Sequence, residues 1–271
     1  MKKWILPFVV AAGLSWLALQ RTDFSLDKIS APLVLETDEI DGMSALQQSY
    51  HFLGKGKQSF AFESADGETV LKFFNRSYFQ MPWYSFLFSK EVEKRRRREF
   101  FYLHSYPLAE KFFRSQTGIL YLHLGKTRGL PTVTLRDKAS RVFSVDLNEV
   151  PFVLQRKGEP FYSVLQAIYE QRGNKGLMFA LDVFLEMIAT RIARGVADAD
   201  HDVEHNFGFL DGRPFHLDPG RLYLRDFSEK ESFDHEWWSS THSLRKWLRK
   251  KYPETVALFD ERVQLQKNGP K

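Results

Sequence analysis

The chain contains no cysteine among its 271 residues. Disulfides, thiolate metal ligands and cysteine nucleophiles are therefore excluded, although this absence does not identify a cellular compartment. Internal repeats and low-complexity tracts are also missing, which argues against a solenoid. Neither charge sign dominates, since the net charge of +5 is modest for this length and does not by itself imply a polyanionic partner.

Long apolar runs are scarce, and the most pronounced one lies at the N-terminus. After two lysines, residues 4–19 carry no charge over 16 positions. A helix of that length spans ~24 Å at ~1.5 Å per residue, which is shorter than a typical hydrocarbon core of ~30 Å. We expect residues 1–22 to be an uncleaved single-pass membrane anchor; a signal peptide, which would leave a secreted protein, is the alternative. Residues 23–48 read as a polar linker.

The sequence has enough apolar material for a sizeable core. Hydrophobic residues make up 43% of the chain and 25 residues are phenylalanine. Without the first 22 residues, about 249 remain, which suffices for one large domain or two lobes.

The most informative stretch runs from residue 194 to 220. An acidic cluster precedes Asn206, and Asp218 follows twelve residues later in an Asp-Pro-Gly turn. Residues 207–216 between them read as strand, Asp-Gly turn and strand, so a hairpin would bring Asn206 and Asp218 together. Two such oxygen ligands suit Mg²⁺, which keeps water and phosphate as its other ligands. The competing interpretation is a surface loop rich in aspartate and histidine.

A second stretch, residues 52–74, combines glycines with a lysine in a strand. Gly54 and Gly56 open an expected hairpin, and residues 69–74 read as a strand with Lys72 among apolar neighbours. Glycines let backbone N–H groups approach phosphate oxygens, and a buried lysine normally needs an anionic partner. Each signal is weak alone, because a strand lysine can also extend its amine to solvent.

The order of these features resembles the protein-kinase-like superfamily. It is most similar to the atypical branches: aminoglycoside-type phosphotransferases, HipA-type toxin kinases and lipid-kinase-like folds. The HipA-type pattern Asp-x-His-x-x-Asn-Phe is partly echoed by residues 205–209, and the resemblance covers residues 50–225. It implies an α+β, bilobal protein-kinase-like fold behind an N-terminal hydrophobic helix. The small antiparallel-sheet N-lobe would span residues 49–158 and the mainly helical C-lobe residues 159–266.

The resemblance also implies a nucleotide site for ATP. Gly54 and Gly56 would cover the phosphates, and Lys72 would contact the α- and β-phosphates. A glutamate from a helix expected over residues 89–116, with a possible break at its proline, would pair with Lys72. Glu99 is our choice over Glu91 and Glu93, because it precedes the apolar section of that helix.

The metal and catalytic roles fall on the acidic loop. Asn206 and Asp218 would hold Mg²⁺, and an aspartate before Asn206 would orient the acceptor hydroxyl. In the family this aspartate lies five residues before the asparagine, where this chain has His201. Asp200 and Asp202 flank it; we favour Asp200 and keep Asp202 as the alternative.

Other elements fit two lobes. An amphipathic helix over residues 177–192 runs directly into the acidic loop. Only 53 residues follow Asp218, and no Ala-Pro-Glu-like anchor is among them, so peptide substrates are less expected and a pseudokinase stays open. The remaining expectations are strands at 130–135, 141–146 and 150–155, a hinge at 156–160 that would bind adenine by resemblance, and terminal helices around 237–238 and 244–252.

The densest charge run is Lys94, Arg95, Arg96, Arg97 and Arg98. Such runs are usually solvated helix faces. The sharper alternative is contact with anionic lipid headgroups, at ~1 kcal/mol per basic residue. A nucleic-acid partner is not expected, because no recognised nucleic-acid motif accompanies the run.

We therefore expect a membrane-tethered, ATP- and Mg²⁺-dependent phosphotransferase that acts on a hydroxyl of an unknown acceptor. Lys72, Asn206 and Asp218 should line one cleft. The alternative is a catalytically inactive, kinase-like binding module at the membrane. The two N-terminal lysines favour an N-terminus inside, which conflicts with the use of cytoplasmic ATP and leaves the side of the membrane open.

Overall fold

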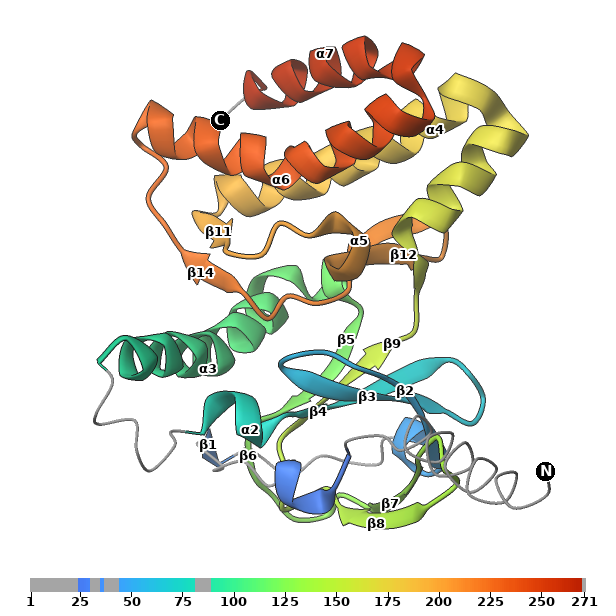
Figure 1. The fold of residues 1–271 in the computed structure, drawn as a ribbon, viewed down its shortest axis with the longest axis vertical. Coiled ribbons are helices and arrows are strands. Elements are labelled where there is room, and N and C mark those ends of the chain that lie inside the picture. Colours follow the sequence, from blue (N-terminus) through green and yellow to red (C-terminus); the bar gives the residue numbers. More distant parts are fainter. Residues whose placement is uncertain (1–23, 30–34, 37–43, 81–88, 270–271) are drawn as a thin grey trace, which may run out of the picture. The chain divides into compact units, whose positions relative to one another are not determined.

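A computed structural model describes residues 24–29, 35–36, 44–80 and 89–269. The chain divides into two compact units, of which the first comprises Met1–Trp83 and Tyr121–Gln155 and the second Tyr84–Leu120 and Arg156–Lys271 (Figure 1). This division differs from the expected lobes, because the long helix after residue 88 groups with the second unit.

The expected anchor at residues 1–22 lies outside the described residues. Among the helices that are described, none combines the length and the apolar composition that a membrane span requires.

Unit 1 is built on a seven-stranded sheet in the order β5-β9-β4-β3-β2-β7-β8. The sheet is mixed, because β2 pairs antiparallel with β3 but parallel with β7. The expectation of an antiparallel sheet is therefore correct only for part of it. The strands are β2 (Ser49–Lys55), β3 (Ser59–Ser64), β4 (Thr69–Phe74), β5 (Ile119–His123), β7 (Thr132–Arg136), β8 (Val142–Asp146) and β9 (Phe152–Arg156). The smaller elements are η1 (Leu26–Lys28), β1 (Leu35–Glu36), η2 (Ser44–Leu46), α2 (Arg76–Phe79) and β6 (Gly125–Lys126).

Local signals placed the central strands correctly. The predicted strand at residues 69–74 is β4, and all six of its residues are buried. The Asp-Gly turn before it uses Gly67 at φ +77°, a backbone conformation that glycine adopts without steric cost. The predicted pair at 130–135 and 141–146 forms β7 and β8, which are antiparallel.

Aromatic rings fill the core of unit 1. Phe24 lies edge to face with Phe60, Phe62 and Phe143 at centroid separations of 5.3, 4.9 and 5.1 Å. Phe24 is only 2% exposed. Where it is described, the segment at 23–48 is therefore part of the core of unit 1 rather than a polar linker.

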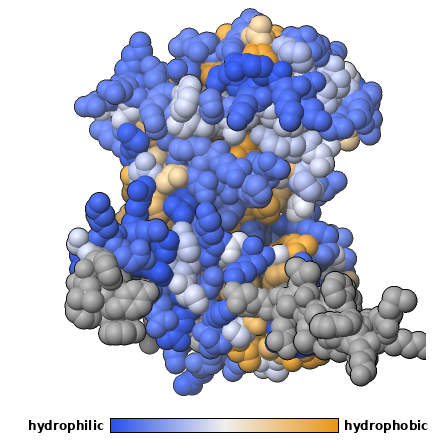
Figure 2. All heavy atoms as spheres, viewed as in Figure 1, coloured by the Kyte–Doolittle hydropathy of each residue, from blue (hydrophilic) through white to orange (hydrophobic). Residues whose placement is uncertain are grey.

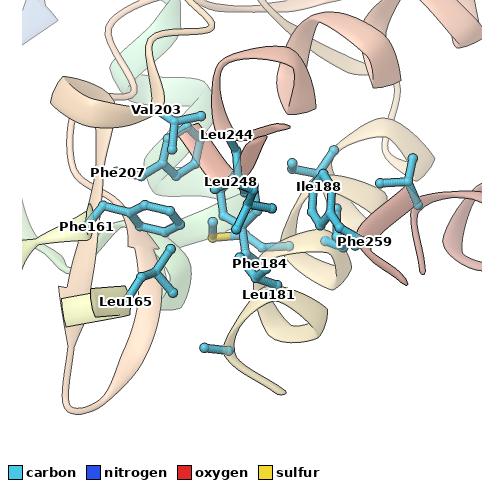
Figure 3. Packing of buried hydrophobic residues seen from close by; sticks show 14 of the residues in the cluster. Phe161, Leu165, Leu181, Phe184, Ile188, Val203, Phe207, Leu244, Leu248 and Phe259 are labelled. Carbon is cyan, nitrogen blue, oxygen red and sulfur yellow. The ribbon is translucent and has the colours of Figure 1, made fainter. Parts of the chain in front are cut away.

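Unit 2 is mainly helical, and α4, α6 and α7 pack against one another (Figure 1). Their apolar faces enclose the buried cluster of Figure 3, which includes Phe161, Phe184, Phe207 and Leu248. The helices are α3 (Ser89–Thr117), α4 (Phe161–Ala193), α5 (Val203–Asn206), α6 (Lys230–Lys251), η4 (Pro253–Thr255) and α7 (Val256–Lys267). Short strands are β10 (Glu159–Pro160), β11 (Val196–Asp198), β12 (Phe207–Leu210), β13 (Arg213–His216) and β14 (Leu222–Leu224).

The predicted helix at 177–192 forms the second part of α4, which is interrupted at Gly173 (φ 59°, ψ −159°). The helix predicted over 89–116 is α3, but its irregularity is at Phe113 rather than at Pro107. An interior proline removes one backbone hydrogen bond and crowds the carbonyl of the preceding turn, but the helical backbone conformation of α3 continues through Pro107.

The segment expected as a hinge, residues 156–160, is fixed within unit 2 by close packing. Glu159 and Pro160 form β10, which pairs with β12. A Cβ atom added at Gly158 would lie 2.2 Å from Cε1 of Phe215, so only glycine fits there. The proposed contact of this segment with adenine stays a prediction.

Unit 1 contains a buried histidine that should make stability depend on pH. His123 is 0% exposed, and its Nδ1 lies 2.9 Å from the carbonyl oxygen of Val150. Burial lowers the pKa of His123, while the bond to Val150 opposes that shift. Below the ordinary pKa of ~6.5 the unfolded chain binds a proton that the folded chain does not, so stability is lost as pH falls towards the folded pKa.

We therefore predict that, relative to the wild type, His123→Leu gains melting temperature as the pH falls from neutral to ~5.5, because the variant lacks the group whose protonation the fold opposes. The control is His51→Gln at an exposed position, which should keep the wild-type slope. Differential scanning fluorimetry across this range measures both. An unchanged slope in His123→Leu would contradict the assignment.

Candidate functional site

The hairpin predicted at 207–216 is present as β12 and β13, with Phe207 opposite His216. Asp211 and Gly212 both have positive φ, 52° and 73°, which matches the two-residue turn that joins twisted strands. Arg156 forms two hydrogen bonds with the carboxylate of Asp211, at 2.6 and 2.9 Å, and so holds the tip of the hairpin.

The hairpin brings Asn206 and Asp218 together. The carbonyl oxygen of Asn206 accepts hydrogen bonds from the backbone amides of Leu217 and Asp218, at 2.8 and 3.2 Å. Backbone hydrogen bonds thus hold the two residues together at the open end of the hairpin, as the predicted strand-turn-strand pattern implied.

Hydrogen bonds also hold the side chains of Asn206 and Asp218, and within the described residues each side chain keeps one oxygen without a protein hydrogen-bond partner. Nδ2 of Asn206 donates to the carbonyl of Asp200 at 2.9 Å. Oδ1 of Asp218 accepts from the Tyr106 hydroxyl at 3.1 Å and from the Gly220 amide at 3.2 Å. Within the described residues, Oδ1 of Asn206 and Oδ2 of Asp218 have no protein hydrogen-bond partner.

These two oxygens have the chemistry of a Mg²⁺ site. Magnesium is commonly bound by one or two protein oxygens, with phosphate and water completing its shell. No cluster of three or more His, Asp or Glu side chains in the described part of the chain could hold a metal on its own. The residues present therefore fit a metal ion that arrives with a phosphate ligand better than a self-contained metal centre.

Tyr106 supplies the buried donor to this pair. Burial raises the pKa of its phenol well above the ordinary value, and the neighbouring Asp218 carboxylate raises it further. The hydroxyl therefore stays protonated and can donate to Asp218. Ser105, the preceding residue on α3, donates to the carbonyl of Leu222 at 2.8 Å, which fixes the helix to β14.

Asp200 and Asp202, the two candidates for the catalytic aspartate, have different surroundings. Asp202 caps α5: its Oδ1 accepts from the Glu204 amide at 3.1 Å, and its Oδ2 lies 2.8 Å from Nδ1 of His205. Asp200 is half-buried, and its backbone is fixed on both sides, by Asp198 and by Asn206. In the described chain its carboxylate has no partner.

A buried ion pair anchors the start of the acidic loop to the helical core of unit 2. Nη1 of Arg191, on α4, lies 2.6 Å from Oε1 of Glu236 on α6. The same Glu236 oxygen accepts from the backbone amide of Asp198 at 3.0 Å, and Nη2 of Arg191 donates to Ser240 at 2.8 Å. The carboxylate of Glu236 thus joins two helices to the end of β11, from which the acidic loop starts.

Two buried carboxyl groups in this network differ in pKa. Burial raises the pKa of Asp198 to about 6, although Arg191 and His201 act to lower it. Burial would also raise the pKa of Glu236, but the nearby His201 ring, with Nε2 3.7 Å away, and the hydrogen-bonded Arg191 lower it to about 2. Glu236 is therefore the permanently charged member, and Asp198, whose Oδ2 lies 3.5 Å from Nε2 of His216, is the one that titrates near neutral pH.

Sequence reasoning missed Arg191, Glu236 and Tyr106. A signal for Arg191 was available, because a charged residue in the apolar stripe between Ile188 and Ile192 requires a buried partner. The partner itself is 45 residues away on another helix, and no local pattern identifies it.

In unit 1 the expected phosphate-binding hairpin is formed by β2 and β3. A bulge between Phe52 and Gly54 interrupts their pairing, and the amide of Gly56 donates to the carbonyl of Ser59 at 2.9 Å. A Cβ added at Gly54 would meet no atom within 4 Å, so the packing of the protein itself does not require this glycine. Lys72 lies in the middle of β4 and is 8% exposed.

Glu99 does not lie in the buried section of α3. The buried residues of this helix include Phe101, Tyr102, Ser105 and Tyr106, whereas Glu99 is exposed. The reason for choosing Glu99 was therefore wrong, because the helical phase turns it away from the core. Its pairing with Lys72, and the convergence of Lys72 with the acidic loop, stay predictions, because Lys72 belongs to unit 1 and the other residues to unit 2.

No protein family model matches the chain, and no curated protein matches it significantly. Several solved structures match it. WbdD bound to the kinase inhibitor LY294002 matches 79% of this chain at 15% identity and a TM-score of 0.40. A high-resolution structure of WbdD matches 82% of it at 14% identity and a TM-score of 0.40. Rv3197 from Mycobacterium tuberculosis, in complex with erythromycin, matches 80% at 12% identity and a TM-score of 0.35.

The chain spans 45–48% of the length of these WbdD chains and 63% of Rv3197. WbdD is described as a bifunctional kinase–methyltransferase. The likeness is to a kinase-like fold at most, and at TM-scores of 0.35–0.40 it carries no argument about function. Function has to be inferred from the chain's own residues.

The Glu236 ion pair makes a direct prediction about stability. Removing one partner of a buried pair leaves the other charge uncompensated, which typically costs ~3–5 kcal/mol. Glu236→Ala should therefore lower the free energy of unfolding by that amount in urea titrations. The control is Asp260→Ala, which breaks the more exposed 2.6 Å pair with Arg245 and should cost below ~1 kcal/mol. Equal costs for the two variants would contradict a structural role for Glu236.

Proposed function

We propose that the chain is a kinase-like phosphotransferase that uses ATP and Mg²⁺ and transfers a phosphoryl group to a hydroxyl of an acceptor. The observation that carries this proposal is the arrangement at the open end of the hairpin. Asn206 and Asp218 are tied by backbone hydrogen bonds, and Asn206 also holds the backbone of Asp200. In the part of the chain that the structure describes, each of the two side chains keeps one oxygen without a protein hydrogen-bond partner.

Each of these residues has a distinct task. Asn206 and Asp218 would hold Mg²⁺, which when bound neutralises charge on the phosphate oxygens. Asp200 would orient the acceptor hydroxyl and take its proton as the oxygen bonds to the γ-phosphorus and the bond from that phosphorus to ADP breaks. Position matters more than unusual reactivity in such chemistry, and the buried network under the loop supplies position.

On the nucleotide side, the bulged hairpin of β2 and β3 would cover the phosphates with Gly54 and Gly56, and Lys72 would contact the α- and β-phosphates. The open space around Gly54 supports this assignment, because the protein's own packing does not require a glycine there and a glycine in a strand can mark the close approach of a ligand. Glu99 remains a candidate partner of Lys72. Residues 1–22 would tether the enzyme to a membrane.

One observation favours an inactive, kinase-like binding module instead. His201 occupies the spacing that the family gives to the catalytic aspartate, and Asp202 uses both carboxylate oxygens in contacts within α5. Of the two candidates, Asp200 is then the one whose carboxylate has no partner within the described residues. Nucleotide binding would not separate the two functions, whereas turnover would.

The metal site is tested by Asp218→Ala. We predict that this variant loses Mg²⁺-dependent ATP binding and keeps its fold, because Oδ2 of Asp218 is one of two protein ligands. With Mg·ATP at 100 times its dissociation constant, the wild-type protein should gain ~2.7 kcal/mol of stability, which a thermal-shift titration detects. The control is Asp226→Ala at an exposed position, which should bind ATP as the wild type does. Undiminished Mg·ATP affinity in Asp218→Ala would count against the site.

The catalytic role is tested by a matched pair of variants. Asp200→Asn should lower phosphoryl transfer or ATP hydrolysis by ~10²–10⁴-fold and leave ATP affinity unchanged, since the carboxylate acts in the chemical step. Asp202→Asn should have little effect, because asparagine caps a helix about as well as aspartate. The reverse order would assign the role to Asp202. ATP binding without any turnover in the wild type, across lipid, small-molecule and protein acceptors, would favour the binding module.

A further inference from the structure

The outward side of α3 carries basic side chains that the proposed phosphotransfer does not use. Six exposed residues follow helical spacing along its first half and form what we call the basic stripe: Lys90, Lys94, Arg96, Arg97, Phe100 and His104. Lys90, Lys94 and Arg97 form one row at i, i+4 and i+7. Arg96, Phe100 and His104 form a neighbouring row at i, i+4 and i+8. Figure 2 shows a strongly hydrophilic surface over this part of unit 2.

The stripe differs from the run Lys94–Arg98 read from the sequence. Within that run, Nε of Arg95 lies 2.8 Å from Oε1 of Glu91, and the Arg95 side chain is only 16% exposed. Arg98 is half-buried. The helix therefore turns part of the run inward, and the available surface follows the helical phase rather than the sequence.

The basic side chains of the stripe are only partly compensated within the helix, where the charge of Lys94 acts on Glu91. Among the described residues, Lys90, Lys94, Arg96 and Arg97 have no ion pair, although Glu93 and Glu99 are also exposed on the same stretch. A solvated helix face normally alternates charges and forms salt bridges at i, i+4. Four exposed basic groups against two exposed acids leave a net positive surface, which is complementary to an anionic partner.

An exposed aromatic ring lies within the stripe. Phe100 is 46% exposed and stacks on His104 at a centroid separation of 4.4 Å and an interplanar angle of 21°. Arg97 lies over the ring of Phe101, 5.7 Å from its centroid. An exposed apolar ring beside basic side chains can add apolar contact to electrostatic attraction at an anionic lipid surface.

We propose that the basic stripe of α3 docks unit 2 on an anionic lipid surface. Each basic residue near such a surface strengthens binding roughly five-fold, so a net excess of two charges gives only weak, reversible contact. A second attachment makes weak contact effective, because a tethered domain docks at a high local concentration. The apolar residues 4–19 are the expected source of that tether, and the inference rests on this part of the proposed function and not on phosphotransfer.

A fluorescent probe on the stripe tests the proposal in the full chain. The absence of native cysteine allows a single labelled site without other changes. Ser89→Cys places an environment-sensitive dye on the exposed first residue of α3, and Asn174→Cys places it on an exposed position of α4 as the control. The protein is reconstituted on phosphatidylcholine vesicles with or without phosphatidylserine, and no nucleotide is added.

The expected result is a blue-shifted, brighter signal from position 89 only with phosphatidylserine, reversed at ~1 M salt, where charges are screened beyond ~3 Å. The control position should not respond. Arg96→Glu with Arg97→Glu should weaken docking by at least about 25-fold. The matched variant Arg172→Glu with Lys175→Glu makes the same charge change on exposed positions of α4 and should leave docking unchanged.

Several results would overturn the proposal. These are an equal response on vesicles without phosphatidylserine, an equal response at position 174, or no loss in the Arg96 and Arg97 variant. A response of the same probe to short DNA but not to vesicles would assign the stripe to nucleic acid instead. ATP binding measured on the same samples separates a failure of docking from a failure of the nucleotide site.

Discussion

The arrangement of the acidic loop depends on one buried carboxylate, that of Glu236. The residue is 1% exposed, and a charge at that depth persists only with partners that offset its lost hydration. Arg191 supplies the opposite charge, and the amide of Asp198 supplies a hydrogen bond to the same oxygen. The end of β11 is thereby attached to two helices of the unit 2 core. From this point Asp198 holds the amide of Asp200, and the carbonyl of Asp200 holds the side chain of Asn206. A short series of hydrogen bonds thus connects the core of unit 2 to the proposed metal ligand Asn206 and restricts its position.

The same network explains why two nearby buried carboxyl groups behave differently. Arg191 is placed to neutralise Glu236, so the pKa of Glu236 falls to about 2 in spite of burial. Asp198 has its pKa raised to about 6 by burial, which outweighs the effect of Arg191, although Arg191 also acts to lower that pKa. Its nearest ionisable neighbour on the hairpin is His216, which stacks on Phe207 at 4.4 Å. The loop therefore has one fixed charge for support and one group whose charge changes near neutral pH, and a pH profile of activity should reflect Asp198 as well as the reacting groups.

The sequence predicted the parts of the fold that local patterns determine. Strand β4 and the hairpin around Asp211 follow from alternation and from Asp-Gly turns, which act over a few residues. The pairing of Asn206 with Asp218 follows directly from that hairpin. Glu99 was expected beside the core because the helix was read from the neighbouring apolar residues rather than from its phase, which leaves Glu99 exposed. Phe24 was assigned to a linker because its aromatic partners lie far along the chain. The sequence favoured Asp200 and kept Asp202 as the alternative, because the cap of α5, which occupies Asp202, depends on backbone geometry that a spacing argument does not contain.

Helix α3 links the two surfaces to which function is assigned. Its inner side donates the Tyr106 hydroxyl to Asp218 and the Ser105 hydroxyl to Leu222 of β14. Its outer side carries the basic stripe, and the helix continues without irregularity from Ser89 to beyond Tyr106. A helix transmits orientation because its backbone hydrogen bonds fix each turn relative to the next, and Arg97 and Tyr106 are separated by ~14 Å along the axis. A surface that orients the stripe therefore also orients the donor that holds Asp218. The proposed membrane contact and the geometry of the proposed metal site would in this way depend on one helix, whose phase determines which residues lie on its inner and outer faces.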